Sequence, residues 1–369
     1  MTNSVSLCYN YGNGVDVMKK EKIMYLDVVR ILATIAVVLV HIASMEPNWS
    51  VYEFSSPEWG VFCSFAAMTK WAAPIFCLIS GALFLDPDRN VTIKKLYTRN
   101  IPRIITGLVF WSAIYAINLI VLFEIDFTKA EFIKRVATGN YHQWYLYMII
   151  GFYILVPALR KITADKDMTR YLAAVAIAFN FIVPFIQLHQ KLDWTTKIIN
   201  QMFITLPGYL AYFLLGYYIH KYDLSKLTKL LVYVSGIASF VITVTETIAK
   251  SAENDSYFRY YTNYNSITVL IQTVFVFVLI KDICSKLKFN NKSEKAITTL
   301  SKDTFAIYQM HPLIIMLLTE FLGFTSTTAL NVELPPIIAI PLLLGVTYVI
   351  SEIISHILNK IPVVNKYLV

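Results

Sequence analysis

The sequence has few charged residues. Asp, Glu, Lys and Arg make up 15% of its 369 residues, whereas 57% are hydrophobic. Soluble globular domains carry about 25% charged residues. The shortage argues against an ordinary soluble enzyme. Repeated apolar runs of roughly 18–22 residues, each long enough to cross a bilayer, indicate a polytopic membrane protein instead.

Cysteine is also scarce. The four cysteines, at positions 8, 63, 77 and 284, show neither close pairs nor the spacing of metal ligands. We interpret them as small apolar fillers and expect no metal site. Internal repeats and low-complexity tracts are lacking, which argues against transporter folds built from duplicated halves. The longest predicted loops, near 124–143 and 285–302, are too short to hold a separate soluble domain.

Residues 1–22 have no apolar core of their own. They are polar and rich in Asn, Ser and Gly, so we expect a disordered cytoplasmic tail rather than a secretory signal peptide. Residues 23–369 are predicted to form one transmembrane domain.

Ten apolar runs predict an all-α polytopic transmembrane helix bundle. Most of the 32 Lys and Arg residues fall between alternate runs, which predicts that both termini lie in the cytoplasm. The same alternation explains the net charge of +8 without a nucleic-acid partner. The predicted spans are 24–44, 60–85, 102–123, 144–161, 170–187, 204–220, 229–249, 266–284, 303–323 and 336–358.

Arg30 and His41 are the strongly polar ionisable groups of the first span. Eleven residues complete three helical turns plus roughly 20°, so both side chains are predicted to lie on one face, about 16 Å apart. Charged groups inside spans usually face a functional cavity. His41 would act as a general base, although an imidazole bonded across helices for packing is the alternative. Arg30 would pair with Asp27, or anchor the helix at the inner membrane surface.

Lys70 is the second intramembrane charge, at the predicted depth of His41. We expect it to hold an acceptor or to stabilise a developing oxyanion; a lysine that extends to the interface is the alternative. The segment 89–103 is the most basic short stretch. Its Arg99 and Arg103 suit phosphates of a nucleotide-type donor or anionic lipid headgroups, although membrane topology alone also explains them.

Several polar or aromatic residues are candidates for substrate contact. Trp144 and Tyr145 begin a predicted span. They belong either to an interfacial aromatic belt or to a wall against which a sugar stacks. His142, just before them, is interpreted as a solvated loop residue. Tyr308 and His311 precede Pro312, and line a cavity or pack in the core. Ser80 beside Gly81 is either part of a site or a close-packing pair.

Five motifs resemble those of the acyltransferase 3 family of integral membrane acyltransferases. They occur in order and cover nearly the whole chain from 24 to 358. The chain is most similar to the compact surface-polysaccharide O-acetyltransferases and to the membrane halves of vancomycin-type serine racemases. The motifs are Asp27-x-x-Arg30 followed by ten residues and His41; PIFCLISG at 74–81; RNIPR at 99–103; HQWYL at 142–146; and FAIYQMHP at 305–312.

The resemblance implies an acyl-CoA donor, with acetyl-CoA as the default, that enters from the cytoplasm of a bacterial cell. Arg30, Arg99 and Arg103 would hold its phosphates, and His41 would deprotonate a hydroxyl of an envelope glycan or lipid-linked sugar at the outer side. A covalent relay through Ser80 or a tyrosine stays open, as does a homo-oligomer.

Two other functions remain open at this point. A secondary transporter or flippase of a glycan intermediate would use Arg30, His41 and Lys70 as substrate or proton sites. A membrane sensor would bind anionic lipid through its basic loops. A transporter predicts flux without acyl-CoA, whereas the enzyme predicts acyl transfer that depends on His41.

Overall fold

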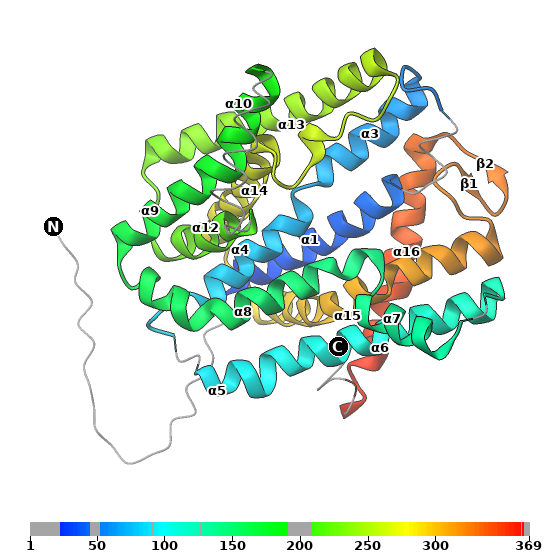
Figure 1. The fold of residues 1–369 in the computed structure, drawn as a ribbon, viewed down its shortest axis with the longest axis horizontal. Helices are drawn as coiled ribbons and strands as arrows, with labels where there is room; N and C mark the ends of the chain where they lie inside the picture. The colour runs from blue at the N-terminus through cyan, green and yellow to red at the C-terminus, as the bar shows by residue number, and fades with distance from the viewer. Residues whose placement is uncertain are drawn as a thin grey trace.

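The computed structural model describes residues 23–44, 52–89, 92–125, 127–190, 208–362 and 364. Within them the fold is an all-α bundle with one short hairpin, so the predicted fold class is confirmed (Figure 1). The predicted tail, 1–22, lies outside the described residues. In chain order the elements are α1 (Met24–Ala43), α3 (Pro57–Thr69), α4 (Ala72–Phe84), α5 (Ile93–Lys95), the π-helical η1 (Leu96–Asn100), α6 (Ile101–Phe123), α7 (Lys129–Thr138), the 3-10 helix η2 (Tyr141–Gln143), α8 (Trp144–Thr163), α9 (Lys166–Ile177), the π-helical η3 (Ala178–Ile182), α10 (Val183–Gln190), α12 (Tyr209–Lys221), α13 (Lys226–Asn254), the 3-10 helix η4 (Tyr260–Thr262), α14 (Ile267–Lys286), α15 (Asn291–Leu322), β1 (Thr328–Ala329), β2 (Val332–Glu333) and α16 (Pro336–Leu358).

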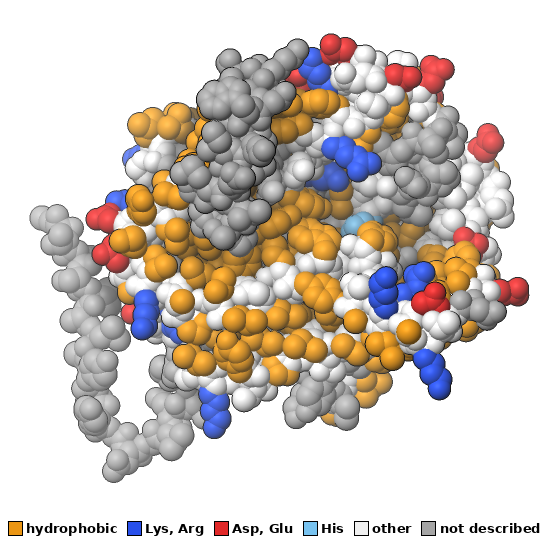
Figure 2. All heavy atoms as spheres, viewed as in Figure 1, with side chains coloured by type: hydrophobic (Ala, Val, Ile, Leu, Met, Phe, Trp, Pro, Cys, Tyr) orange, Lys and Arg blue, Asp and Glu red, His pale blue; other side chains and the backbone are white. Residues whose placement is uncertain are grey.

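Nine helical segments of the described residues are long and apolar enough to cross a membrane. They correspond to nine of the ten predicted runs. The tenth, 204–220, overlaps α12, and its first residues lie outside the described part of the chain. Figure 2 shows hydrophobic side chains over the middle of one face and charged side chains mainly toward its two ends, as expected for a bundle surrounded by lipid.

The first helix lies at the centre of the bundle. α1 contacts α3, α4, α14, α15 and α16, which surround it in Figure 1. Val29, Ala33 and Val38 on α1 are fully buried. Its polar side chains therefore face other helices rather than lipid.

Two stretches predicted as loops contain helices. α15 begins at Asn291 rather than near residue 303, because the Asn290 side chain accepts the N–H of Ser293 and caps the helix. Within 124–143, α7 begins with a capping box, in which the Thr128 and Glu131 side chains each accept a backbone N–H from the other residue. These two loop predictions were wrong because an apolar run locates only the lipid-facing part of a helix.

Two glycines bring α4 and α12 into backbone contact. A Cβ atom at Gly81 would lie 1.8 Å from the Phe213 carbonyl oxygen, and one at Gly216 would lie 2.0 Å from the Leu78 carbonyl oxygen. No side chain fits at such distances, so only glycine permits this crossing. Ser80, next to Gly81, takes its position from this backbone contact.

Candidate active site

Arg30 and His41 both face α15. The Arg30 guanidinium donates hydrogen bonds to Asp27 (3.0 Å) and to the Ser301 hydroxyl on α15 (2.8 Å). The His41 ring lies 5.1 Å from the His311 ring, also on α15, measured between centroids. The prediction that Arg30 and His41 share one face of α1 is therefore confirmed, and so is the pairing of Arg30 with Asp27.

Three imidazole rings gather at this end of α1. His142 lies 6.3 Å from His41 and 5.5 Å from His311 between ring centroids. We call His41, His142 and His311 the imidazole cluster. The interpretation of His142 as a solvated loop residue was wrong, because η2 turns its side chain inward and leaves it 2% exposed.

His311 has a defined tautomer. Its Nδ1 lies 3.1 Å from the Ile307 carbonyl oxygen, which can only accept a hydrogen bond, so Nδ1 carries the proton. Nε2 is buried and has no hydrogen-bond partner among the described residues. A buried acceptor without a donor costs about 1–3 kcal/mol. A hydroxyl group placed beside Nε2 would remove that cost.

A series of hydroxyl groups lies between Arg30 and the imidazole cluster. Ser80 lies close to Tyr145 and Tyr153 of α8, and Tyr153 lies within electrostatic reach of Arg30. The Tyr145 ring is 6.1 Å from the Tyr308 ring. The Tyr308 hydroxyl in turn donates a hydrogen bond to the backbone carbonyl of His142, a member of the imidazole cluster. Polar side chains thus connect the two predicted ends of the site.

Trp144 belongs to a different group of aromatic residues. Its ring lies 5.4 Å from Tyr209 and 5.5 Å from Tyr264, between centroids. Tyr145 instead contacts Phe76, at 6.0 Å. The Trp144 and Tyr145 rings also contact each other, with centroids 6.2 Å apart, so the two aromatic groups meet at this pair.

Tyr115 of α6 inserts its hydroxyl into the backbone of α15. The hydroxyl donates to the Gln309 carbonyl (2.8 Å) and accepts from the Leu313 N–H (3.2 Å). An uninterrupted helix would join these two backbone groups directly. Pro312 lies between them and lacks an N–H group of its own. The Tyr115 hydroxyl therefore anchors α6 to the backbone of α15 at its proline, next to His311.

Lys70 lies where the second span is interrupted. α3 ends at Thr69 and α4 begins at Ala72, so Lys70 stands in the break. Its side chain is half-buried and within electrostatic reach of His41 and of Cys63. The structure thus places an ammonium group close to the imidazole cluster.

Arg99 and Arg103 lie on different elements from Arg30, with which they were predicted to bind the donor. Arg99 belongs to η1 and Arg103 to the first turn of α6, and both are exposed. They are close enough to interact electrostatically with each other, whereas Arg30 bonds within α1 and to α15.

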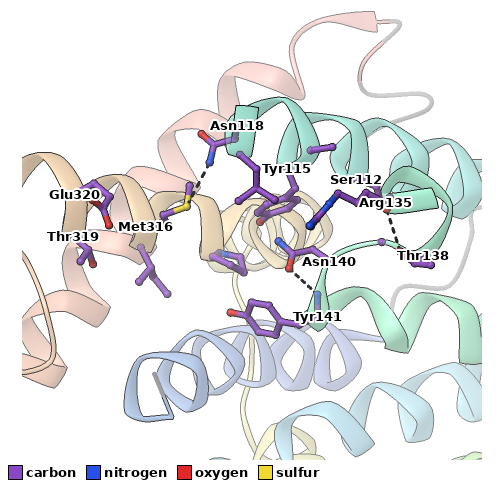
Figure 3. Close-up of a pocket in the computed structure, with 15 residues that line it drawn as sticks. Ser112, Tyr115, Asn118, Arg135, Thr138, Asn140, Tyr141, Met316, Thr319 and Glu320 are labelled. Atoms are coloured by element: carbon purple, nitrogen blue, oxygen red, sulfur yellow. Dashed lines mark hydrogen bonds between the residues drawn. The ribbon is translucent and has the colours of Figure 1, made fainter. Parts of the chain in front are cut away.

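A cavity of about 610 Å³ opens between α6, α7 and α15, next to the imidazole cluster (Figure 3). Tyr141 connects the two, since it lines the cavity while its ring lies 5.3 Å from the His41 ring. The other polar and aromatic residues that line the cavity are Ser112, Tyr115, Asn118, Arg135, Thr138, Asn140, Thr319 and Glu320.

At the predicted cytoplasmic end of the bundle, hydrogen bonds and ion pairs stabilise the turn after α4. Arg160 donates to the carbonyls of Asp86 (2.5 Å) and Pro87 (3.0 Å) in the turn after α4. The Lys221 ammonium bonds to Asp86 (3.0 Å) and Asp88 (2.7 Å). This hydrogen bond holds the pKa of the Asp88 carboxyl below its usual value. The turn therefore keeps α4 and α12 in register at this end.

One family model, described as an acyltransferase domain, matches residues 23–356. The chain belongs to the acyltransferase 3 family. Relatives in Staphylococcus aureus strains MSSA476 and Mu50 carry the description "Probable poly-beta-1,6-N-acetyl-D-glucosamine export protein". They are 25% identical to this acyltransferase 3 chain over 309 and 312 residues, which is 79% of this chain and 83% of each relative. No solved structure matches the chain significantly.

Two residues of this acyltransferase 3 chain, Tyr141 and Tyr115, were missed from the sequence, and His142 was assigned the wrong environment. His142 belongs to the HQWYL motif and Tyr141 directly precedes it, so the motif marked these positions without showing where their side chains point. Nothing in the pattern around Tyr115 distinguishes it, because its contact with α15 arises only in the folded bundle.

Proposed function

We propose that this acyltransferase 3 member is a multi-pass O-acyltransferase of a bacterial plasma membrane. It would move an acyl group, acetyl by default, from cytoplasmic acyl-CoA to a hydroxyl of an envelope glycan. The observation that carries this proposal is the position of His41. It stands in the imidazole cluster, on the same face of α1 as Arg30, and its ring contacts Tyr141, which lines the cavity of about 610 Å³.

In the proposed reaction His41 takes the proton of the acceptor hydroxyl, whose oxygen attacks the thioester carbonyl. The Lys70 ammonium stabilises the resulting oxyanion. The carbon–sulfur bond then breaks, and the proton held by His41 passes to the leaving sulfur to give the free thiol of CoA. Arg99 and Arg103, exposed at the predicted inner end, offer the charge that CoA phosphates require, and Arg30 stands between them and His41 in this scheme.

The test is acyl transfer by purified protein in detergent, with radiolabelled acetyl-CoA and a β-1,6-linked N-acetylglucosamine oligomer as acceptor. We expect His41→Ala to lower the rate by about 10²–10⁴-fold, the usual effect of removing a general base. His356→Ala is the matched control, because that imidazole is exposed on α16 and distant in sequence from every motif. Equal losses in both variants, or normal transfer by His41→Ala, would contradict the proposal.

Export of the glycan is the second candidate function. The S. aureus relatives favour it, because they are described as probable export proteins of poly-beta-1,6-N-acetyl-D-glucosamine. An exporter would move a fluorescent oligosaccharide across proteoliposomes that contain no acyl-CoA. We expect no such flux from this chain; flux without a donor, unaffected by His41→Ala, would favour export over acyl transfer.

A further inference from the structure

The cavity between α6, α7 and α15 carries opposite charges at its two ends. Figure 3 shows Arg135 at one end, and Thr319 with Glu320 at the other. Among the described residues neither Arg135 nor Glu320 forms an ion pair, although Arg135 lies over the Phe127 ring at 4.4 Å. A guanidinium only donates hydrogen bonds and a carboxylate only accepts them. A ligand that spans the cavity therefore needs acceptors at one end and donors at the other.

The middle of the cavity adds an exposed aromatic ring. Tyr141 is 63% exposed, which is unusual for a side chain so close to a buried cluster. Asn140 stands beside it, and its side-chain oxygen already accepts the Tyr141 N–H (2.7 Å). The amide NH₂ of Asn140 is therefore the group left to donate toward a ligand. An apolar ring surface flanked by such donors and acceptors suits a polyhydroxylated ring.

We propose that this cavity binds neutral pyranose units of the glycan acceptor, with Tyr141 as the ring against which one sugar packs. Hydroxyl groups both donate and accept, so a neutral glycan satisfies Arg135 and Glu320 together. A polyanionic glycan would be repelled at Glu320, and a polycation at Arg135. The cavity volume of about 610 Å³ lies within the range of ordinary ligand pockets. The inference rests on the proposed function, since it takes the ligand to be that enzyme's acceptor.

The position of the cavity gives the sugar access to the base. The Tyr141 ring separates the cavity from His41 by one aromatic contact, and Figure 3 shows Tyr141 on the side of the cavity nearest α1. A hydroxyl that reaches past the edge of this ring meets the imidazole cluster. The buried Nε2 of His311 is there to accept its hydrogen bond.

The experiment measures binding without any donor, on the full chain in nanodiscs. The probe is a fluorescent trimer of β-1,6-linked N-acetylglucosamine, and the readout is thermophoresis. We expect Tyr141→Ala to weaken binding about tenfold, whereas Tyr141→Phe, which keeps the ring, stays within about threefold of the original chain. Arg135→Ala should weaken binding about fivefold to tenfold, and its neighbour Lys134→Ala, which does not line the cavity, should have no effect.

A second pair of variants tests the acidic end. Glu320→Gln keeps the shape and removes the charge, and we expect about threefold weaker binding of the neutral trimer. Glu246→Gln, in a separate cavity near α13 and α14, is the matched control and should bind as the original chain does. An anionic trigalacturonate should bind at least about tenfold more weakly than the neutral trimer, and Glu320→Gln should narrow that difference.

The proposal is overturned if the original chain does not bind the neutral trimer, if Tyr141→Ala and Arg135→Ala bind it normally, or if trigalacturonate binds equally well. Because no acyl-CoA is present, a chain that binds the trimer but never transfers an acyl group would count against the enzyme and not against this site. Unchanged melting temperatures show that each variant is folded.

Discussion

At the scale of residues, buried polar atoms without partners gather beside His41. Within the described residues they include both ring nitrogens of His142, Nε2 of His311 and Nε2 of Gln309. Each such atom costs about 1–3 kcal/mol when no partner is present. Folded proteins rarely keep these costs close together unless a ligand or ordered water removes them. The arrangement is therefore typical of a polar binding site and not of a packed core.

Asp88 gives a prediction for pH at the same scale. Its pKa is lowered because the ionised carboxyl bonds to Lys221. A carboxyl whose pKa falls on folding stabilises the native state above its unfolded pKa, near 3.8, and loses that contribution as the pH drops through the folded value. We expect Asp88→Asn to lower the melting temperature slightly at pH 7 and by less at pH 3, as followed by differential scanning fluorimetry.

The effect of Asp88→Asn should be small even at pH 7, because Asp88 is exposed and Lys221 keeps its bond to Asp86. Asp167→Asn is a suitable control with another exposed ion pair. A loss that persists unchanged at pH 3 would show that charge is not the cause.

At the scale of elements, the contact between α6 and α15 determines the shape of the site. Tyr115 bridges two backbone groups of α15, and Gln143 of η2 accepts from Ser112 of α6 (2.9 Å) and donates to Gln309 of α15 (3.1 Å). These bonds fix the turn that carries His311. Two of the residues that form these bonds, Ser112 and Tyr115, also line the cavity described above.

Tyr115→Phe should therefore disturb catalysis more than binding of the donor. Without the hydroxyl, the Gln309 carbonyl and the Leu313 N–H each lose a hydrogen-bond partner, and the backbone next to His311 loses its anchor to α6. We expect a stability loss of about 1–2 kcal/mol and a kcat about tenfold lower, with little change in the KM for acyl-CoA. Steady-state kinetics and thermal unfolding measure the two effects.

The control is Tyr217→Phe, which loses a hydrogen bond to the Thr163 carbonyl (3.0 Å) away from the imidazole cluster. It should lose comparable stability and keep its kcat. If Tyr115→Phe also keeps its kcat, the bridge to α15 supports the fold alone.

At the scale of the whole molecule, the proposed donor and acceptor sites lie at opposite ends of the bundle. Arg99 and Arg103 stand near the start of α6, while the cavity is lined by the second half of α6 and by the residues after α7. The predicted topology makes the first end cytoplasmic and the second external. The protein would then join a soluble cytoplasmic donor to an acceptor outside the cell.

Labelling of single cysteines tests this orientation. In a chain whose four native cysteines are replaced by alanine, Lys134→Cys on α7 should react with a membrane-impermeant maleimide in intact cells. Lys161→Cys near the end of α8 should react only after the cells are permeabilised. The reverse pattern, or labelling of both in intact cells, would contradict the predicted topology and place the cavity on the wrong side for an external acceptor.

Much of the fold was predictable from the sequence because apolar runs mark spans directly. The common face of Arg30 and His41 followed from helical geometry alone. The early start of α15 was missed although Asn290 is an ordinary cap residue. The inward position of His142 and the bridge made by Tyr115 could not be read from the sequence, because each depends on which helices become neighbours.

The glycine contact between α4 and α12 has a consequence for how large substrates enter. Backbone atoms that touch directly leave no side chains to rearrange, so these two helices behave as one rigid unit and Ser80 moves with it. Displacement that admits a polymer then has to come from the opposite flank. There α7 carries no buried residue, so its displacement would break few contacts of the hydrophobic core.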